Sequence, residues 1–258
     1  MAQIVVYNWH FYAAALLFDS LAVILMVRLH LPVATRLLIC LIAALATFWA
    51  LSSLLVSHYV YDRSRLYRWD WLTHVLPSPG VWANIHAGLD QTSAPLTQLF
   101  PTPRRRILDI YIPSEMSEPS IRRARHQARP AQAAEKANPA ALPLVDCECD
   151  TIFLIFAAHE LRRREARLRF FREINRALQP GGRVVLVEHL RNWNNFLAYG
   201  PGALHFFSRR EWLTVSNLAD LQVINECGIT PFVRCFVLAK RTGVDADAPH
   251  PVGKGSCC

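Results

Sequence analysis

The segment Phe171–Leu190, FREINRALQPGGRVVLVEHL, decides the fold because it joins a predicted helix to a predicted buried strand. In its first half, apolar residues recur at helical spacing with charged residues between them, the pattern of an amphipathic helix. Pro180 cannot continue that helix, and Gly181 and Gly182 supply the positive-φ conformations that a tight turn needs. The helix is therefore predicted to end at this turn.

A continuous apolar run, Val184–Val187, follows the turn. Such a run is typical of a strand that helices cover on both faces of a parallel sheet. Glu188 and His189 then lie at the carboxyl end of a buried strand, and this is the edge at which open α/β sheets bind their ligands. The sequence predicts a ligand site there.

The composition of the chain argues against nucleic-acid-binding, zinc-binding and disulfide-rich proteins. The chain has 258 residues and a net charge of +8, enough length for one α/β domain and an accessory segment. No cluster interleaves basic residues with aromatic ones, so we expect no nucleic-acid partner and attribute the charge to a membrane-side, solvated surface. The seven cysteines fit neither a zinc site nor a disulfide framework, which predicts a reducing compartment and no metal.

The N-terminal residues 1–60 are predicted to form a transmembrane hairpin. No charged residue interrupts Leu37–Val56, and Phe11–Val27 is a second apolar run broken only by Asp19. A span needs about 20 apolar residues, so both runs qualify. Aromatic residues flank the two outer ends as an interfacial belt would. The alternative is an apolar helical pair buried in a soluble fold or in a dimer; a signal peptide lacks support because no basic segment precedes the first run.

Charge sets the expected orientation of the hairpin. The connector between the two runs carries Arg28 and Arg36, whereas three arginines follow the second run before Trp69. The positive-inside rule then favours a multi-pass membrane protein with its C-terminal domain in the cytoplasm. Asp19 is expected to pair across the hairpin or to lie near its end, because an isolated charge in the bilayer is costly.

Beyond an interfacial linker at residues 61–80, strand and helix patterns alternate over residues 81–241. We expect strands at Val81–Ile85, Arg106–Tyr111, Thr151–Phe156, Leu221–Ile224 and Val233–Ala239, the last antiparallel, and helices at Ala94–Phe100, Glu118–Ala128 and after Glu160. This alternation predicts an α/β fold with a mostly parallel sheet. Arg129–Ala141 is interpreted as a loop and residues 242–258 as a disordered tail.

Three segments resemble the class I S-adenosylmethionine-dependent methyltransferases, of the type 11 group. They are the Gln-Pro-Gly-Gly turn quoted above, LPLVDCECDTIFLIFAAHEL at Leu142–Leu161, and RILDIYIPSEMSEPSIRRAR at Arg106–Arg125. In order and spacing they are similar to the fifth-strand, fourth-strand and second-strand motifs of that family, and together they cover about Trp82–Arg241. The resemblance implies a Rossmann-like sheet of seven strands with an antiparallel terminal strand.

The resemblance also implies S-adenosylmethionine as cofactor. Asp109, with Ile110 beside it, would accept hydrogen bonds from the ribose hydroxyls, and Asn138 would contact the adenine. Asn84, His86 and Gly88 stand where the family has an acid and alternating glycines around the methionine end of the cofactor. Only Gly88 of those glycines is present, because His86 and Asp90 occupy the other positions.

Catalytic candidates are the polar residues that follow the fourth and fifth predicted strands. His159, Glu188 and His189 would orient the acceptor or remove its proton, with Glu160 as a neighbour. Structural roles for these residues remain the alternative. His205 is expected in aromatic packing or in an acceptor pocket, and Ser208 as a helix N-cap completed by Glu211.

Two function classes follow. The first is a membrane-anchored methyltransferase that acts on a lipid-like or small-molecule acceptor, with the lipid bilayer as its partner. The second is a non-catalytic, methyltransferase-like membrane module, which the missing glycines favour. The sequence does not determine the oligomeric state.

Overall fold

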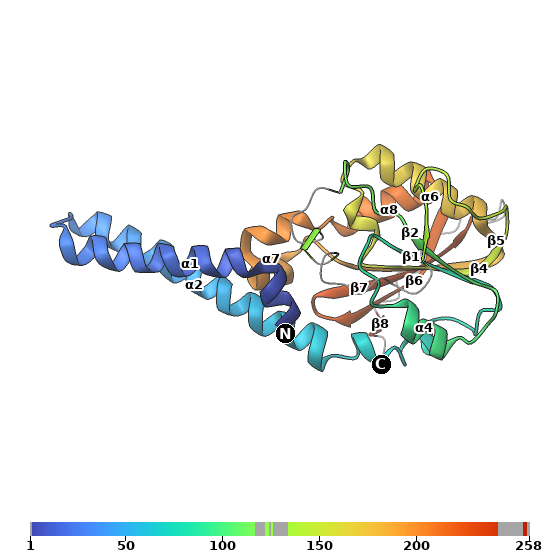
Figure 1. The fold of residues 1–258 in the computed structure, drawn as a ribbon, viewed down its shortest axis with the longest axis horizontal. Helices are drawn as coiled ribbons and strands as arrows, with labels where there is room; N and C mark the ends of the chain where they lie inside the picture. Colours follow the sequence, from blue (N-terminus) through green and yellow to red (C-terminus); the bar gives the residue numbers. More distant parts are fainter. Residues whose placement is uncertain (1, 117–121, 124, 126–133, 242–254, 257–258) are drawn as a thin grey trace. The chain divides into compact units, whose positions relative to one another are not determined.

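The computed structural model describes residues 2–116, 122–123, 125, 134–241 and 255–256 (Figure 1). The chain forms two compact units. The helical unit contains Met1–Ser64 and Asn192–His205, and the sheet unit contains Arg65–Arg191 and Phe206–Cys258.

Two long helices make up most of the helical unit. Helix α1 spans Ala2–Arg28 and α2 spans Val33–His58, and α2 continues into a π-helical turn, η1, at Tyr59–Arg63. The hydroxyl of Thr47 on α2 donates a 2.7 Å hydrogen bond to Oδ2 of Asp19 on α1. The prediction that Asp19 pairs across the hairpin is therefore confirmed for Oδ2, whereas Asp19 Oδ1 has no hydrogen-bond partner among the described residues.

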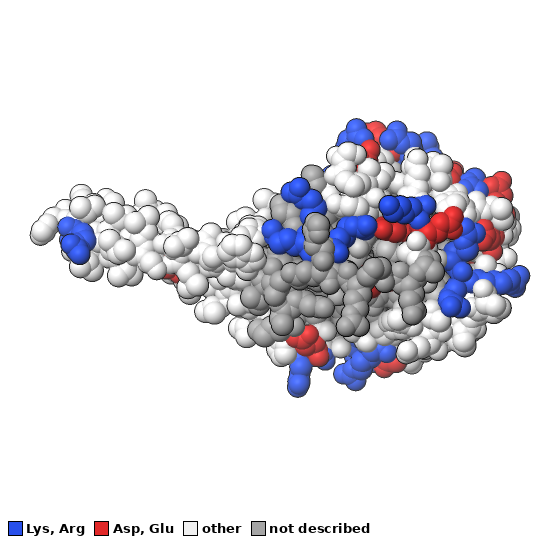
Figure 2. Space-filling view, viewed as in Figure 1, with Lys and Arg blue, Asp and Glu red and all other residues white. Residues whose placement is uncertain are grey.

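The outer surface of these helices is apolar. Their most apolar windows have mean hydropathies of 1.9 and 2.3, and only 6% and 0% of those windows are buried. Figure 2 shows the hairpin as an almost uncharged surface, with the charged residues gathered elsewhere. Both helices are long and apolar enough to cross a membrane.

Two short helices from much later in the chain complete the helical unit. Helix α7 spans Trp193–Tyr199, and the 3₁₀ helix η4 spans Gly200–His205. Their sequence lies inside the 81–241 range that we expected to form one domain.

The sheet unit begins with the short helices η2 (Leu66–Arg68) and α3 (Leu72–Val75), which precede a sheet with the order β3-β2-β1-β4-β5-β7-β6-β8. The strands are β1 Trp82–His86, β2 Arg105–Asp109, β3 Glu135–Lys136, β4 Cys149–Ile155, β5 Leu178–His189, β6 Leu221–Thr230, β7 Val233–Lys240 and β8 Gly255–Ser256. Strand β7 runs antiparallel to β5 and β6, and the remaining pairs are parallel. The predicted Rossmann-like architecture is confirmed, with the two-residue β8 added to the seven expected strands.

Three details differ from the sequence-based predictions. Strand β3 lies inside Arg129–Ala141, where we expected a loop, and β8 lies in the tail that we expected to be disordered. Strands of two residues show no periodicity, so pattern analysis misses them. Cys227 is disulfide-bonded, contrary to the expected absence of disulfides. The predicted helix at Glu118–Ala128 lies mostly outside the described residues.

Helices cover both faces of the sheet (Figure 1). Helices α6 (Arg164–Ala177) and α8 (Arg209–Leu218) pack on one face, where their apolar side chains join alternate strand residues such as Ile85 and Leu186. On the other face, where α4 (Ser93–Leu99) lies, the Phe153 ring contacts the rings of Trp82 and Phe100. The ring centroids are 5.9 Å apart in both pairs. This double coverage explains the unbroken apolar run of β5.

Helix α6 and strand β5 form as predicted, but the turn between them does not: β5 begins at Leu178, so Pro180, Gly181 and Gly182 lie within the strand, where its register with β4 shifts. Helix α6 ends at Ala177, before Pro180, and Gly181 has a φ of +79° as predicted. Gly182, however, is not a positive-φ residue. A Cβ on it would lie 2.9 Å from the Asp150 carbonyl oxygen, so this glycine is required by close backbone approach.

Candidate functional site

The carboxyl ends of four parallel strands meet at one edge of the sheet. Strands β1 and β2 pair so that His86 lies opposite Asp109, and β4 and β5 pair so that Ile155 lies opposite Val187. Glu188 and His189 are the next two residues of β5. The predicted cofactor and catalytic residues therefore come from neighbouring strand ends, as a ligand site in this fold requires.

Asp109, the expected ribose-binding residue, is partly buried at the end of β2. Its Oδ1 accepts a 3.0 Å hydrogen bond from the backbone N–H of Tyr111. Its Oδ2 accepts a 2.9 Å hydrogen bond from the guanidinium of Arg125. The carboxylate is thus held at the sheet edge by its own turn and by a basic residue that the sequence reasoning did not select.

Arg125 also covers the loop after β1. Its guanidinium carbon lies 4.3 Å from the centre of the Tyr111 ring. Gly88 has a φ of +94°, and a Cβ built on it would collide with the Arg125 guanidinium and lie 2.8 Å from Arg125 Cδ. Arg125 therefore occupies the space directly above Gly88, while it pairs with Asp109.

His86 ends β1 beside this loop and is almost fully buried. The Gly88 N–H donates to His86 Nδ1 at 3.2 Å. Burial lowers the pKa of His86, despite the opposing effect of Asp90 and Asp109, so the ring is neutral at neutral pH. With Nδ1 as acceptor, its proton lies on Nε2, which has no hydrogen-bond partner among the described residues.

Asn84 and Asp90 have structural partners. Asn84 is fully buried in β1 and donates to the hydroxyls of Thr92 and Ser93, at 2.7 and 2.8 Å. Asp90 Oδ1 accepts from the backbone N–H groups of Thr92 and Ser93, at 3.1 and 2.9 Å. Both residues therefore contact the start of α4.

Ile110 and Asn138 are placed differently from one another. The Ile110 side chain is fully buried in the core, and its N–H donates to the His86 carbonyl at 2.9 Å. Asn138 is exposed just after β3, and its Oδ1 accepts from the Ala140 N–H at 2.9 Å. The side-chain amide of Asn138 is exposed and can contact a ligand. The side chain of Ile110 instead packs in the core beneath the carboxyl edge of the sheet.

The end of β4 carries the second part of the site. Phe156 has a φ of +54°, an unusual conformation for a bulky residue, and leads into the 3₁₀ turn η3 at Ala158–Glu160. In that turn the His159 N–H donates to Glu188 Oε1 at 3.2 Å, and His159 Nδ1 lies 2.8 Å from Glu188 Oε2. The carboxylate of Glu188 therefore holds both the backbone and the ring of His159.

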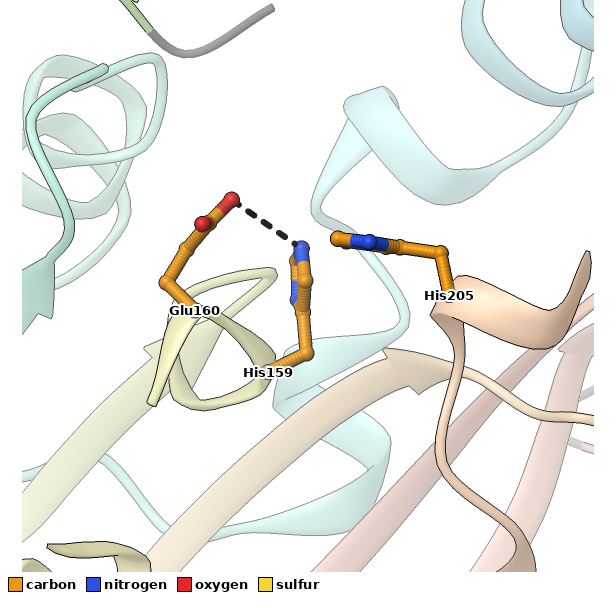
Figure 3. Close-up of side chains that lie close together, drawn as sticks. All are labelled: His159, Glu160 and His205. Carbon is orange, nitrogen blue, oxygen red and sulfur yellow. Dashed lines mark ion pairs between the residues drawn. The ribbon is translucent and has the colours of Figure 1, made fainter. Parts of the chain in front are cut away.

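His159 lies between two carboxylates. Its Nε2 is 3.4 Å from Glu160 Oε1, an ion pair that Figure 3 shows with a dashed line. Burial acts to lower the pKa of His159, but the charges and hydrogen bonds of Glu188 and Glu160 outweigh it and raise the pKa to about 10. The ring is therefore an imidazolium at neutral pH.

His189 has a packing environment. Its ring stacks on Phe156 and Phe206, with centroids 5.1 and 4.9 Å away. Its Nδ1 lies 3.0 Å from the Phe232 carbonyl oxygen, an arrangement in which Nδ1–H donates. These contacts favour a structural role over a catalytic one.

The segment after η4 also has structural roles. Phe207 packs edge-on against Trp212 and lies under the guanidinium of Arg167, 3.7 Å from its ring centre. Ser208 caps α8 by accepting from the Glu211 N–H at 3.2 Å, as predicted. The Glu211 side chain pairs with Arg167 at 2.6 Å. His205 belongs to the helical unit.

Arg125 and Tyr111 are the site residues that sequence reasoning missed. Arg125 is the last residue of the RILDIYIPSEMSEPSIRRAR segment, sixteen positions after Asp109. Nothing in the local pattern distinguishes it from the arginines at 122 and 123. Its role is visible only because the fold brings it over both Asp109 and Gly88.

Comparisons with known proteins agree with this geometry. Residues 95–186 match the family model described as a methyltransferase domain, a range that contains Asp109 and His159 and begins after Gly88. No curated protein matches the chain at a significant level.

Solved structures share the fold. A SAM-dependent methyltransferase from Aquifex aeolicus aligns with a TM-score of 0.51 at 17% identity, over 69% of this chain and 94% of its own. A protein described as a type 11 methyltransferase from Sulfolobus solfataricus aligns with a TM-score of 0.50 at 15% identity, over 73% of this chain and 97% of its own. The chain therefore has the fold of these SAM-dependent methyltransferase structures, and residues 95–186 match the methyltransferase-domain model.

Proposed function

We propose that this protein transfers a methyl group from S-adenosylmethionine to a lipid-like or small-molecule acceptor at a membrane surface, with its catalytic domain on the cytoplasmic side. The observation that carries the proposal is the placement of Asp109 and of the His159–Glu188 pair at one edge of the sheet. Asp109 would bind the ribose of the donor, and the His159–Glu188 pair would lie beside the acceptor.

The residues present fit the donor on two counts. Gly88, at a φ of +94°, lets the backbone approach a ligand, and the buried Nε2–H of His86 is a donor that a ligand carboxylate would satisfy. Asp109 would accept hydrogen bonds from the ribose hydroxyls once Arg125 releases it. Arg125 meets Gly88 with the flexible end of its side chain, so it can withdraw without a backbone change.

The donor supplies a methyl group that its sulfonium already activates, so the chain's residues mainly bind and align the two substrates. His159 holds a proton at neutral pH because Glu188 and Glu160 raise its pKa to about 10. In that state it cannot take a proton from the acceptor, and its two ring nitrogens already face Glu188 Oε2 and Glu160 Oε1. We therefore assign His159 the role of holding these two carboxylates in place beside the acceptor.

The membrane part of the proposal depends on the helical unit. Its two helices are long enough to span a bilayer, and their apolar side chains are exposed. The only charged residue in the first apolar run, Asp19, accepts a hydrogen bond through Oδ2 from Thr47 of the second helix. An anchored domain of this kind suits an acceptor that is itself dissolved in the bilayer. A helical pair buried in a dimer is the competing interpretation.

A second function has a specific observation in its favour. In a non-catalytic, methyltransferase-like membrane module, the Arg125–Asp109 ion pair would be permanent. Two positions that are glycines in the family, His86 and Asp90, carry side chains here, and Asp90 is committed to the start of α4.

Binding of the demethylated product, S-adenosylhomocysteine, separates the two functions. The full chain in detergent micelles would be titrated calorimetrically and heated with and without this ligand. A ligand at 100 times its dissociation constant stabilises the native state by about 2.7 kcal/mol, which is readily seen as a thermal shift. Neither heat nor shift at millimolar ligand would reject the enzyme and leave the non-catalytic module.

A further inference from the structure

The helical unit contains a segment that neither the hairpin nor the sheet requires. Residues 192–205 leave the sheet unit after Arg191 and return at Phe206. The residues that flank this segment pair with each other: Leu190 forms a β-bridge with Phe207, and the Arg191 N–H donates to the Phe207 carbonyl at 2.9 Å. Helix α7 and the 3₁₀ helix η4 therefore form an excursion, residues 192–205, whose two ends are held together. It leaves the sheet unit two residues after His189.

This excursion packs on α2. The Phe196 and Trp49 rings contact edge to face, with centroids 5.8 Å apart. Gly200 lies against the same indole, and a Cβ on it would come within 2.6 Å of Trp49 Cδ2. Within the helical unit, α7 is thus fixed at the level of Trp49.

Three large side chains of the excursion are apolar and exposed. Trp193, Leu197 and Leu204 are 76%, 57% and 61% exposed. No Asp, Glu, Lys or Arg occurs from residue 192 to residue 208. Side chains of this kind are unusual together on a water-facing surface, and they continue the apolar exterior of α1 and α2.

Helix length sets the depth of this segment. Trp49 lies sixteen residues after Val33, the first residue of α2, which is about 24 Å at 1.5 Å per residue. The hydrocarbon core of a bilayer is about 30 Å thick. If α2 starts at the far boundary of the core, Trp49 lies about 6 Å inside the near boundary. Helix α7, docked on Trp49, then lies next to the near interface, where tryptophan is favoured.

We propose that residues 192–205 form an interfacial membrane element, with Trp193, Leu197 and Leu204 in contact with lipid at the boundary between headgroups and acyl chains. This inference depends on the membrane anchoring in the proposed function and extends it. The lipid-facing surface includes a segment that follows β5 directly, so the chain that carries Glu188 and His189 enters the membrane interface within a few residues of them.

Photo-crosslinking tests this placement. The full chain would be reconstituted in phosphatidylcholine vesicles with p-benzoylphenylalanine in place of Leu197 or Leu204, and lipid adducts measured by mass spectrometry. Leu41, an exposed residue of α2, is the positive control, and Leu218, an exposed residue of α8 in the sheet unit, is the negative control. We expect adducts at 197 and 204 comparable with those at 41, and none at 218.

The other outcomes are distinguishable. Adducts at 41 without adducts at 197 and 204 would overturn the inference and leave the anchoring intact. No adducts at 41 would reject the anchoring itself, and the inference with it. Crosslinks from 197 or 204 to a second copy of the chain would assign this surface to a dimer and overturn the inference.

A glycine pair provides a structural control. Gly200→Ala places a methyl group against Trp49, whereas Gly202→Ala places one 3.9 Å from the Tyr199 Cβ, an ordinary contact. We expect Gly200→Ala to reduce lipid adducts at 197 while adducts at 41 stay unchanged, and Gly202→Ala to alter neither. Equal adducts in the two variants would contradict the docking of α7 on Trp49 as the cause of its position.

Discussion

The guanidinium of Arg125 donates to the carboxylate of Asp109 at 2.9 Å and thereby occupies the group that the donor ribose is expected to use. The same side chain fills the space above Gly88. Arg125 would thus compete with a cofactor that binds Asp109 and approaches Gly88. Its contribution can be measured, because the ion pair is partly exposed and its loss should not unfold the domain.

Replacing Arg125 should strengthen donor binding. Partly exposed ion pairs contribute about 0.2–1 kcal/mol, so Arg125→Ala should lower the dissociation constant of S-adenosylhomocysteine by up to about fivefold. Calorimetric titration provides the measurement. Arg122→Ala, at an exposed arginine of the same segment, is the control and should bind like wild type. Weaker binding by Arg125→Ala would instead make Arg125 a ligand contact.

Replacing Asp109 should have the opposite effect. If its carboxylate holds the ribose hydroxyls, Asp109→Ala should lose about 1.5–3 kcal/mol of binding free energy, the range for hydrogen bonds to charged groups. Asp146→Ala is the matched control, since Asp146 is an exposed carboxylate that pairs with Arg176 before β4 begins. Equal affinities for the two variants would place the cofactor away from β2.

Alanine substitutions at two glycines distinguish the effect of backbone strain from a steric clash with the ligand. Gly181 and Gly88 both have positive φ, at +79° and +94°, but only Gly88 has atoms within 4 Å of the position that an alanine methyl group would take. Alanine at either position should cost about 1 kcal/mol of stability. Only Gly88→Ala should also abolish the thermal shift with S-adenosylhomocysteine. Retention of the full shift in Gly88→Ala would show that the loop after β1 does not approach the ligand.

The His159 site should make stability depend on pH. The folded pKa is raised from 6.5 to about 10, so the stabilisation is fully present below pH 6.5 and is lost as the pH rises towards 10. At 1.36 kcal/mol per unit of pKa, the loss has an upper bound of about 5 kcal/mol. Urea unfolding of wild type and His159→Gln across this range would reveal it. The difference between them should shrink as pH rises, and parallel profiles would contradict the coupling to Glu188.

Charges in α2 should weaken membrane insertion. Leu41 and Leu45 are exposed in the middle of the apolar run, and an arginine at the centre of a span costs about 2.5–3.5 kcal/mol. Wild type should remain in the membrane pellet after alkaline extraction, whereas Leu41→Arg with Leu45→Arg should be recovered in part from the supernatant. Val145→Arg, at an exposed apolar residue of the sheet unit, should behave like wild type. Release of the wild-type chain would end the membrane assignment.

Local pattern was sufficient for most of the fold. Although Pro180–Gly182 lie within β5 rather than in a separate turn, the helix end and the buried strand were predictable, because a proline with two glycines stops a helix and a continuous apolar run forms a doubly covered strand. The same holds for Asp109 and Glu188, whose positions at strand ends follow from where the apolar runs stop. The two-residue strands β3 and β8 were not predictable, because their only support is pairing with distant strands.

The chemistry at the strand ends depends on tertiary structure. The sequence determined that His159 follows one strand and Glu188 ends another, but only their 2.8 Å contact gives His159 its raised pKa, because that shift requires a carboxylate held beside the ring in a buried site. Arg125 contacts Asp109 and covers Gly88 only because folding brings it to residues sixteen and more positions away. Likewise, no local signal assigned residues 192–205 to the helical unit. That assignment arises from a glycine and an indole, Gly200 and Trp49, whose close packing the chain achieves across about 150 intervening residues.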